Sequence, residues 1–450
     1  MKSIQKYKNP ILEGNIWQQL LVFFFPILLA SLFQQLYNAA DAVVVGRYVS
    51  KEALSAVGGT SAAVIQMING IFVGLSAGAT VIVSQYYGAK EDKGVSEAVH
   101  TAFTFSIVSG LVMMVVGIIY APNMLEAMST PADVMNESVT YLRIYFLGMV
   151  GNLVYNMGAG ILRAVGDTKR PLYFLIFTCG LNIILDLFFI LGIGMGVEGA
   201  GYATIISQTL SAIMIVALLL RSKENYKVYI KSFKIHINVL AKIIKIGVPA
   251  AIQSVMYTGA NILTQKSING LSTNAIAAWA AYSKIDGLYW MIMGAFGISI
   301  TTFVGQNYGA GKFDRINESV KKCAVMSVGV SIIVSILIYV FGDICLMLFT
   351  PDMEVVAIGM EIIHLIVPFY ISYVGIEILS GALRGIGNVW VPMILCAFGV
   401  CAIRVVWNLV IVPIKPELSV IIFTFPLTWV ITTVLFLVYI LWKKPFKIGK

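Results

Sequence analysis

Long apolar runs dominate this sequence. A helix that crosses a bilayer needs about 20 consecutive, mainly apolar residues. Only 12% of the 450 residues are charged, whereas a soluble domain carries about a quarter. The sequence therefore predicts an all-α polytopic membrane protein and argues against a soluble enzyme or a nucleic-acid-binding protein. Its twelve predicted spanning helices begin near Trp17, Ala53, Ser96, Met135, Thr168, Gly199, Ala241, Ala275, Ser319, Val355, Val389 and Glu417.

Basic residues alternate between successive loops. If the N-terminus is cytoplasmic, the segments on that side hold 24 of the 31 Lys and Arg residues, including three N-terminal lysines and seven residues between Arg221 and Lys245. The opposite loops are nearly free of basic residues, and Pro122–Asp133 carries only acids. This pattern obeys the positive-inside rule and predicts that both termini are cytoplasmic.

The two halves of the chain share motifs at a fixed spacing. Gln85–Ala89 (QYYGA) recurs as Gln306–Ala310 (QNYGA), and Leu162–Gly166 (LRAVG) recurs as Leu383–Gly387 (LRGIG), each 221 residues later. Each half contains six predicted spans, an even number, so both halves enter the membrane in the same direction. The sequence therefore predicts two parallel six-helix repeats related by an axis along the membrane normal.

This repeat divides the chain into an N-terminal lobe (1–220), a basic cytoplasmic linker (221–241) and a C-terminal lobe (242–450). Two parallel lobes favour transport by alternating access around a central cavity. The sequence contains no nucleotide-binding loop, no His-rich motif and no pair of catalytic Asp residues in a span. We therefore expect a transporter and not an enzyme, with a non-transporting membrane scaffold as an alternative.

Two acidic residues lie deep in spans of the first half. Asp41 lies in the first span, and Asp186 lies in the fifth, four residues after Asn182 and on the same helix face. Pro26 recurs as Pro249, 223 residues later, so the position that corresponds to Asp41 lies near Thr264, and at a spacing of 221 residues the counterpart of Asp186 is Trp407. Ionisable groups in a membrane are costly and usually functional, so these acids predict a coupling site for H⁺ or Na⁺. The structural alternative is that each acid only bonds its neighbours.

The second half has its own charges at membrane depth, Lys284, Asp286, Glu377 and Arg404. They could pair with one another, and Glu377 is the one we expect to contact substrate or protons. Methionine and aromatic side chains can repack around varied apolar ligands, although each is more often a core residue. The residues expected to line a substrate cavity are Gln34, Tyr37, Met67, Met256, Tyr257, Asp286, Met291 and Glu377.

Jointly, five segments of the first half and their second-half echoes resemble the MATE (multidrug and toxic compound extrusion) family of transporters over essentially the whole chain. The segments are Pro26 with Asp41, Gln85–Ala89, Leu162–Asp167, Asn182–Asp186 and Gly196–Ala200. The resemblance implies a V-shaped pair of six-helix bundles in the bacterial inner membrane. It also implies a monomer that exports amphipathic, often cationic drugs or metabolites, with Na⁺ or H⁺ as coupling ion and no other cofactor.

The resemblance also implies roles for individual residues. In the prokaryotic branch with a cation site in the first lobe, a fourth-span tyrosine joins the site, here Tyr141 with Tyr145 as the alternative, and the first helix kinks at a proline, here Pro26. The cation ligands of that branch map to Asp41, Asn182, Asp186 and Thr204.

Two features bear on the alternatives. Some relatives carry a functional Glu in the seventh span, but this chain has no acid between Val248 and Gly270. A seventh-span carboxylate mechanism is therefore not expected here. A flippase for lipid-linked saccharides is the rival function, and it favours Arg and Lys in the cavity, whereas the first lobe presents acids.

Overall fold

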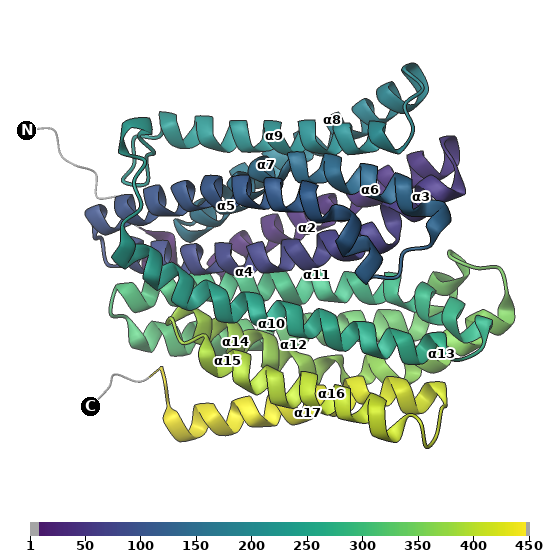
Figure 1. Ribbon diagram of the computed structural model, residues 1–450. Coiled ribbons are helices and arrows are strands. Elements are labelled where there is room, and N and C mark those ends of the chain that lie inside the picture. Colours follow the sequence, from purple (N-terminus) through teal and green to yellow (C-terminus); the bar gives the residue numbers. More distant parts are fainter. Residues whose placement is uncertain (1–8, 447–450) are drawn as a thin grey trace, which may run out of the picture. The chain divides into compact units, whose positions relative to one another are not determined.

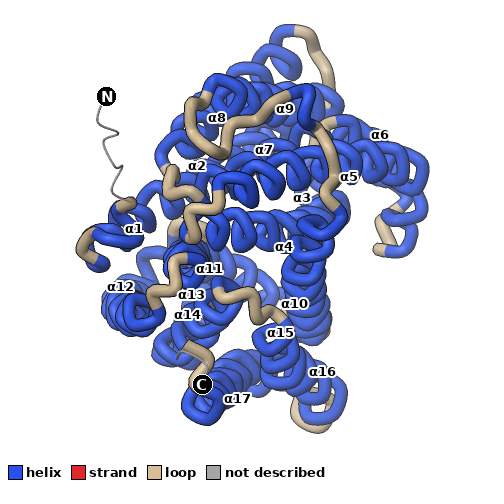
Figure 2. Tube along the Cα trace, turned by 90° about the vertical axis from the view of Figure 1, so that its left-hand side faces the viewer, coloured by secondary structure: helices blue, strands red, loops and turns tan. Residues whose placement is uncertain are grey.

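The computed structural model describes residues 9–446, and helices joined by short loops account for nearly all of them (Figures 1 and 2). No strand occurs in this described part of the chain. Lys2, Lys6, Lys8, Lys447 and Lys450, which contribute to the predicted orientation, lie outside it.

Three of the six spans of the first half are single long helices, and the other three contain a break. These helices are α1 (Pro10–Glu13), α2 (Ile16–Tyr48), α3 (Lys51–Gly58), α4 (Thr60–Gly88), α5 (Asp92–Ala127), α6 (Ala132–Leu147), α7 (Met149–Ala164), α8 (Lys169–Leu187), the π turn η1 (Phe188–Gly192) and α9 (Val197–Arg221). The second half follows the same order, after a short linker turn. Its elements are η2 (Ile230–Ser232), α10 (Ile237–Asn269), α11 (Thr273–Gly309), α12 (Phe313–Met347), α13 (Met353–Ile366), η3 (Val367–Phe369), α14 (Tyr370–Gly385), α15 (Trp390–Cys396), η4 (Ala397–Ala402), α16 (Ile403–Val406), η5 (Trp407–Ile411) and α17 (Leu418–Lys443).

The predicted spans are confirmed. Residues 9–446 contain eleven helices long and apolar enough to cross a membrane, and α6 with α7, bent by 51°, makes twelve if the pair is one span. The largest difference between a predicted and an observed start is six residues, at Ser319 against Phe313. The twelve apolar runs therefore locate the spans, because each crossing of the bilayer needs about 20 mainly apolar residues in a helix.

The bend between α6 and α7 lies at Gly148. A Cβ atom on this residue would come within 2.5 Å of Ile205 Cγ2 on α9. Only glycine lets the α6–α7 bend approach α9 so closely at this point. In the second half, the corresponding span is broken at η3, which contains Pro368 and lies between α13 and α14.

The repeated LRxxG motif ends a helix in the same way in each half. Gly166 (φ +100°) and Gly387 (φ +86°) both adopt the left-handed conformation that glycine favours. The amide after each glycine donates to a carbonyl five residues back, from Asp167 to Leu162 over 2.8 Å and from Asn388 to Leu383 over 2.9 Å. These paired bonds form a Schellman cap, so the motif is a helix-terminating scaffold element.

The chain forms two compact units whose edges differ from the sequence repeat. One unit comprises residues 25–251, and the other comprises residues 1–24 together with 252–450. The boundaries fall inside α2 and α10, so the first helix of each repeat begins in one unit and ends in the other.

Unit 25–251 packs the start of α10 closely against α4. A Cβ on Gly74 would come within 2.5 Å of the Ala251 nitrogen, and one on Gly78 within 2.4 Å of the Ile243 carbonyl oxygen. Small residues four apart let two membrane helices bring their backbones together. The linker before α10 is also held in this unit, because His100 Nε2 accepts from the Tyr229 amide over 2.9 Å.

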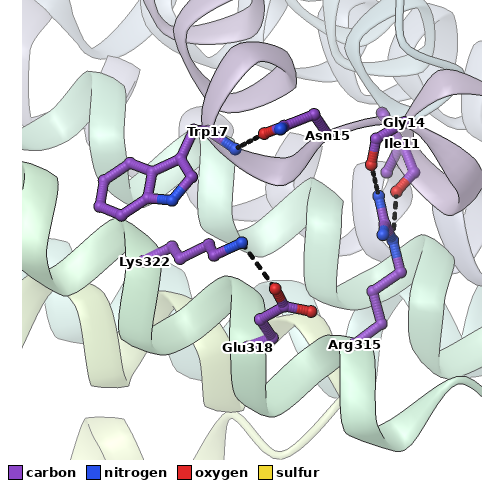
Figure 3. A network of polar contacts seen from close by, with 7 residues as sticks. All are labelled: Ile11, Gly14, Asn15, Trp17, Arg315, Glu318 and Lys322. Atoms are coloured by element: carbon purple, nitrogen blue, oxygen red, sulfur yellow. Dashed lines mark hydrogen bonds and ion pairs between the residues drawn. The ribbon is translucent and has the colours of Figure 1, made fainter.

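The second unit holds the chain's first helical turn against α12 (Figure 3). Arg315 donates from Nε to the Ile11 carbonyl over 3.0 Å and from Nη2 to the Gly14 carbonyl, and Lys312 donates to the Leu12 carbonyl over 2.9 Å. These carbonyls belong to α1 and its end, where helical carbonyls lack partners of their own. Lys312, just before α12, and Arg315, in its first turn, therefore cap α1.

Broad apolar surfaces remain exposed on the long helices. On α12, Ile333, Ile336 and Val340 are each more than half exposed, and on α17 Val438 and Leu441 are as well. A soluble protein rarely exposes such continuous apolar rows. They are the expected lipid-facing surfaces of a multi-pass membrane protein.

Candidate functional site

Three predicted site residues come together inside unit 25–251. Asp41 on α2 is 4% exposed, while Asn182 and Asp186 on α8 are fully buried. The carboxyl groups of Asp41 and Asp186 lie close enough to interact directly, and Asn182 lies beside Asp41. The i, i+4 spacing on α8 therefore does put Asn182 and Asp186 on the face that meets the acid of α2.

Helix α9 contributes the fourth predicted ligand. The Thr204 hydroxyl donates to Asp41 Oδ2 over 3.2 Å. The Thr204 carbonyl accepts from the Tyr37 hydroxyl over 3.3 Å, which links α2 to α9 a second time. Tyr141 on α6 is 5% exposed and lies within electrostatic reach of Asp41 and Asp186. We call Asp41, Tyr141, Asn182, Asp186 and Thr204 the acid cluster.

Most polar atoms of the acid cluster have unused hydrogen-bonding capacity. Among the described residues, no hydrogen bond reaches Asp41 Oδ1, either oxygen of Asp186, or either polar atom of the Asn182 amide. Buried polar atoms are normally bonded, and an isolated buried charge is far more costly than a neutral group. An arrangement of this kind suits a bound cation or proton that supplies the missing interactions.

Tyr145, the alternative to Tyr141, belongs to a different group of side chains. Its hydroxyl accepts from Asn69 over 3.1 Å and from Asn152 over 3.0 Å. Asn156 donates to the Asn152 amide oxygen over 2.5 Å and extends this chain of amides along α7. This cluster could not be predicted from the sequence, because amides on two separate helices, α4 and α7, form no sequence motif.

The other predicted residues of the first lobe are not part of this cluster's core. Pro26 lies inside the long helix α2. Gln34 is exposed and Met67 is 41% exposed, so both face a surface of the unit. Among the described residues, no hydrogen bond joins Gln34 to Asp41 or Asp186.

In the second unit, Asp286 on α11 is surrounded by aromatic donors. Its carboxylate accepts from Tyr370 over 2.5 Å, from Trp290 over 2.6 Å and from Tyr282 over 3.3 Å. Glu377 on α14 accepts from Tyr373 over 3.1 Å. Met256, Tyr257 and Met291 are half-buried, and the Tyr257 hydroxyl has no partner among the described residues.

Mutual pairing was one alternative for the four charges of the second half, and they do not form ion pairs in the described part of the chain. None of Lys284, Asp286, Glu377 and Arg404 has an opposite charge within 4.0 Å. Lys284 is exposed, whereas Arg404 is 2% exposed and binds neutral side chains.

The structure shifts one repeat pairing by a residue. Thr264, the counterpart of Asp41, accepts a hydrogen bond from Asn408 over 3.3 Å, and Trp407 instead donates to the Val420 carbonyl. The π turn η4 explains the shift, because a π turn adds one residue to a helix. Asp186 therefore corresponds to Asn408 and Asn182 to Arg404, and the second lobe still lacks both acids.

Comparison with known proteins gives a consistent result. The family model MatE matches residues 26–188 and 249–410, one stretch in each half. Among curated proteins, the chain is 27% identical to the probable multidrug resistance protein YoeA of Bacillus subtilis, over 89% of this chain and 87% of that protein. It is 25% identical to the probable multidrug resistance protein NorM of Thermotoga maritima, over 87% and 84%.

Solved structures share the fold. A multidrug resistance MATE family transporter of the MOP superfamily in an outward-facing conformation matches with a TM-score of 0.91 at 21% identity, over 98% of each chain. A MOP superfamily transporter from Pyrococcus furiosus matches with a TM-score of 0.90 at 20% identity, again over 98% of each chain. The family model covers most of the chain, and the chain therefore belongs to the MATE family of multidrug efflux transporters.

Proposed function

We propose that this chain is a cation-coupled antiporter that exports amphipathic, often cationic drugs or metabolites from the cytoplasm by alternating access. In this proposal it works as a monomer in a bacterial inner membrane, with H⁺, Na⁺ or both as coupling ion. The names of the curated relatives support multidrug export as the transported class. The acid cluster is the observation that carries the coupling.

The cluster fits either ion. Carboxylate, amide and hydroxyl oxygens of Asp41, Asp186, Asn182 and Thr204 are the ligand types that hard cations prefer. Two neighbouring buried carboxyl groups can equally share a proton, because two ionised carboxylates side by side repel each other. In both cases the bound ion neutralises charge that the helices otherwise bury at high cost.

Ion binding in this proposal is linked to substrate release. A cation entering from outside moves down the membrane potential, which contributes about 2.3 kcal/mol per charge for each 100 mV. When Asp41 is neutralised, its carboxyl group is a weaker hydrogen-bond acceptor. The bond from Thr204 is then weaker, and the contact between α2 and α9 changes. Because α2 contains Pro26, the part of the helix before it can bend as this contact changes.

The test is dye efflux from proteoliposomes with Na⁺ and pH gradients imposed separately. Wild-type protein is expected to move a cationic dye only when one of the gradients is present. Asp41→Asn keeps the size of the side chain and removes its charge, so gradient-driven efflux should fall to the level of empty liposomes. Asp133→Asn is the matched control, because Asp133 is an exposed acid of the same unit, and it should behave like wild type.

Three results contradict the proposal. Full gradient-driven efflux by Asp41→Asn would show that the acid cluster does not couple the ion gradient to export. Dye flux that is the same with and without either gradient would show that transport is not coupled to Na⁺ or H⁺. No flux of any dye, together with displacement of bound dye by a lipid-linked saccharide, favours a flippase instead.

A further inference from the structure

The linker between the two halves exposes apolar side chains at one end of unit 25–251. It runs from Arg221, the last residue of α9, to Ile237, the first residue of α10 (Figure 1). Tyr229 is 52% exposed, Ile230 is 67% exposed, and Ile237 is exposed as well. Because α9 and α10 are both long and apolar enough to cross a membrane, the linker that joins them lies at a membrane surface.

The same segment is strongly basic. Residues 221–245 contain seven Lys and Arg residues and one acid, Glu224. Lys231 and Lys234 are both exposed, and neither has an ion-pair partner in the part of the chain that the structure describes. Uncompensated positive charge therefore follows directly after the two exposed apolar residues, Tyr229 and Ile230.

Hydrogen bonds hold the linker against the unit. The Tyr229 amide donates to His100 Nε2 over 2.9 Å, and the His236 amide donates to Thr101 Oγ1 over 3.1 Å. Val228, next to Tyr229, is buried. The backbone of the linker is therefore fixed on both sides of Ile230, and its exposed side chains form a surface of defined structure.

The chemistry of this surface fits an anionic phospholipid. Tyrosine is enriched where proteins meet the membrane interface, because its ring is apolar and its hydroxyl is polar. An isoleucine side chain gains free energy when it leaves water for the boundary between headgroups and acyl chains. Lysine has a long apolar stem and an ammonium group that reaches headgroup phosphates. A free anion in water would satisfy the lysines but not the apolar side chains.

We propose that Tyr229, Ile230, Lys231 and Lys234 form a binding surface for anionic phospholipids, which we call the lipid-binding patch. Tyr229 and Ile230 enter the membrane interface, and the two lysines contact headgroup phosphates. Bound lipid then anchors the segment of chain that connects the two halves. The acid cluster contains no residue of the linker, so the inference goes beyond the proposed antiport and does not depend on it.

The test measures lipid binding to the purified full-length protein in neutral detergent by native mass spectrometry. Phosphatidylglycerol and phosphatidylcholine with identical acyl chains are added separately, and the affinity for the first bound lipid is compared. Wild type is expected to bind phosphatidylglycerol at least about fivefold more tightly. The double variant Lys231→Gln/Lys234→Gln should weaken binding of phosphatidylglycerol roughly fivefold for each lysine removed and leave binding of phosphatidylcholine unchanged. Ile230→Ser removes apolar contact but no charge, so it should weaken binding of both lipids by the same factor.

The double variant Lys90→Gln/Lys93→Gln is the matched control. Both lysines are exposed residues of the same unit, but the acids Glu91 and Asp92 lie between them in the sequence. Asp92 also accepts a hydrogen bond from Asn225 of the linker over 2.8 Å, so the control lies beside the linker. Removing these two positive charges should leave both affinities unchanged.

Three results overturn the inference. The first is equal binding of the two lipids by wild type, a comparison that needs no variant and decides the question even if a variant does not fold. The second is an equal loss of phosphatidylglycerol binding in the linker double variant and in the control. The third is displacement of phosphatidylglycerol by excess inorganic phosphate, which would identify a site for free anions, whereas a lipid held partly by apolar contacts should stay bound.

Discussion

Thr204 donates its hydroxyl hydrogen to Asp41 Oδ2 over 3.2 Å and thereby joins α9 to α2. The other carboxylate oxygen, Oδ1, accepts no hydrogen bond among the described residues. Loss of the bond from Thr204 should alter the ion affinity of the acid cluster, and the direction depends on the ion.

Thr204→Val removes both the donor and a possible oxygen ligand. If Na⁺ is the coupling ion, we expect half-maximal dye efflux to need about tenfold more Na⁺, because a ligand is lost. If H⁺ is the coupling ion, the ionised carboxylate loses a stabilising bond and binds protons more tightly, so half-maximal efflux moves to higher pH. Thr204→Ser keeps the hydroxyl and should match wild type. An unchanged response of Thr204→Val to both ions would contradict a role for this contact.

The close approach of α4 and α10 predicts a strong effect of a single methyl group. In Gly74→Ala the new Cβ would meet backbone atoms of Ala250 and Ala251, which cannot rotate away. We expect a loss of about 1–3 kcal/mol in the free energy of unfolding, measured as a lower melting temperature in detergent. Gly180→Ala is the control, because its Cβ meets nothing within 4 Å. Equal melting temperatures for the two variants would contradict the predicted packing.

His100 holds the linker between the halves. Its Nδ1 lies 2.7 Å from the Ser96 carbonyl and therefore carries the hydrogen, which leaves Nε2 to accept from the Tyr229 amide. In His100→Ala we expect faster tryptic cleavage at the exposed Lys231 and Lys234, followed by gel electrophoresis. His236→Ala is the control, since His236 binds Thr101 only through its backbone amide, so cleavage should stay at the wild-type rate.

Arg315 should hold α1 more strongly than the ion pair beside it does (Figure 3). Arg315→Ala removes two charged bonds to carbonyls of the Ile11–Gly14 segment. We expect hydrogen exchange in this segment to become at least about tenfold faster, as measured by mass spectrometry. Lys322→Ala removes the surface pair with Glu318, which contributes about 0–1 kcal/mol, and a cation–π contact with Trp17 on α2, but no bond to the Ile11–Gly14 segment. Equal exchange rates in the two variants would show that Arg315 does not clamp α1.

Span positions could be predicted from the sequence because every helix that crosses a bilayer needs an apolar run of about 20 residues. The breaks could not all be placed in this way. Gly148 lies at the bend of a span, and its missing side chain leaves room for Ile205, a residue two spans away along the chain. A glycine that allows a close approach looks the same in the sequence as one that faces open space, such as Gly180.

The acid cluster could be anticipated because ionisable residues are rare in spans, and the structure does bring the predicted residues together. Their role in ion coupling remains a prediction. The counterparts of this cluster in the second lobe could not be predicted in the same way, because the π turn η4 shifts the register by one residue. This shift conceals that Arg404 and Asn408 correspond to Asn182 and Asp186. A fixed repeat spacing cannot detect a change in helix type.

Helices α2 and α10 each begin in one compact unit and end in the other. Neither half of the gene therefore encodes a complete unit. If the two halves arose by duplication, a protein built from one half would have had to exchange the start of its first helix with a second copy in order to complete its fold. Fusion of the two copies would then have placed both exchanged segments in one polypeptide. After fusion, each half could change alone, so that Asp41 is present only in the first half and Arg404 only in the second.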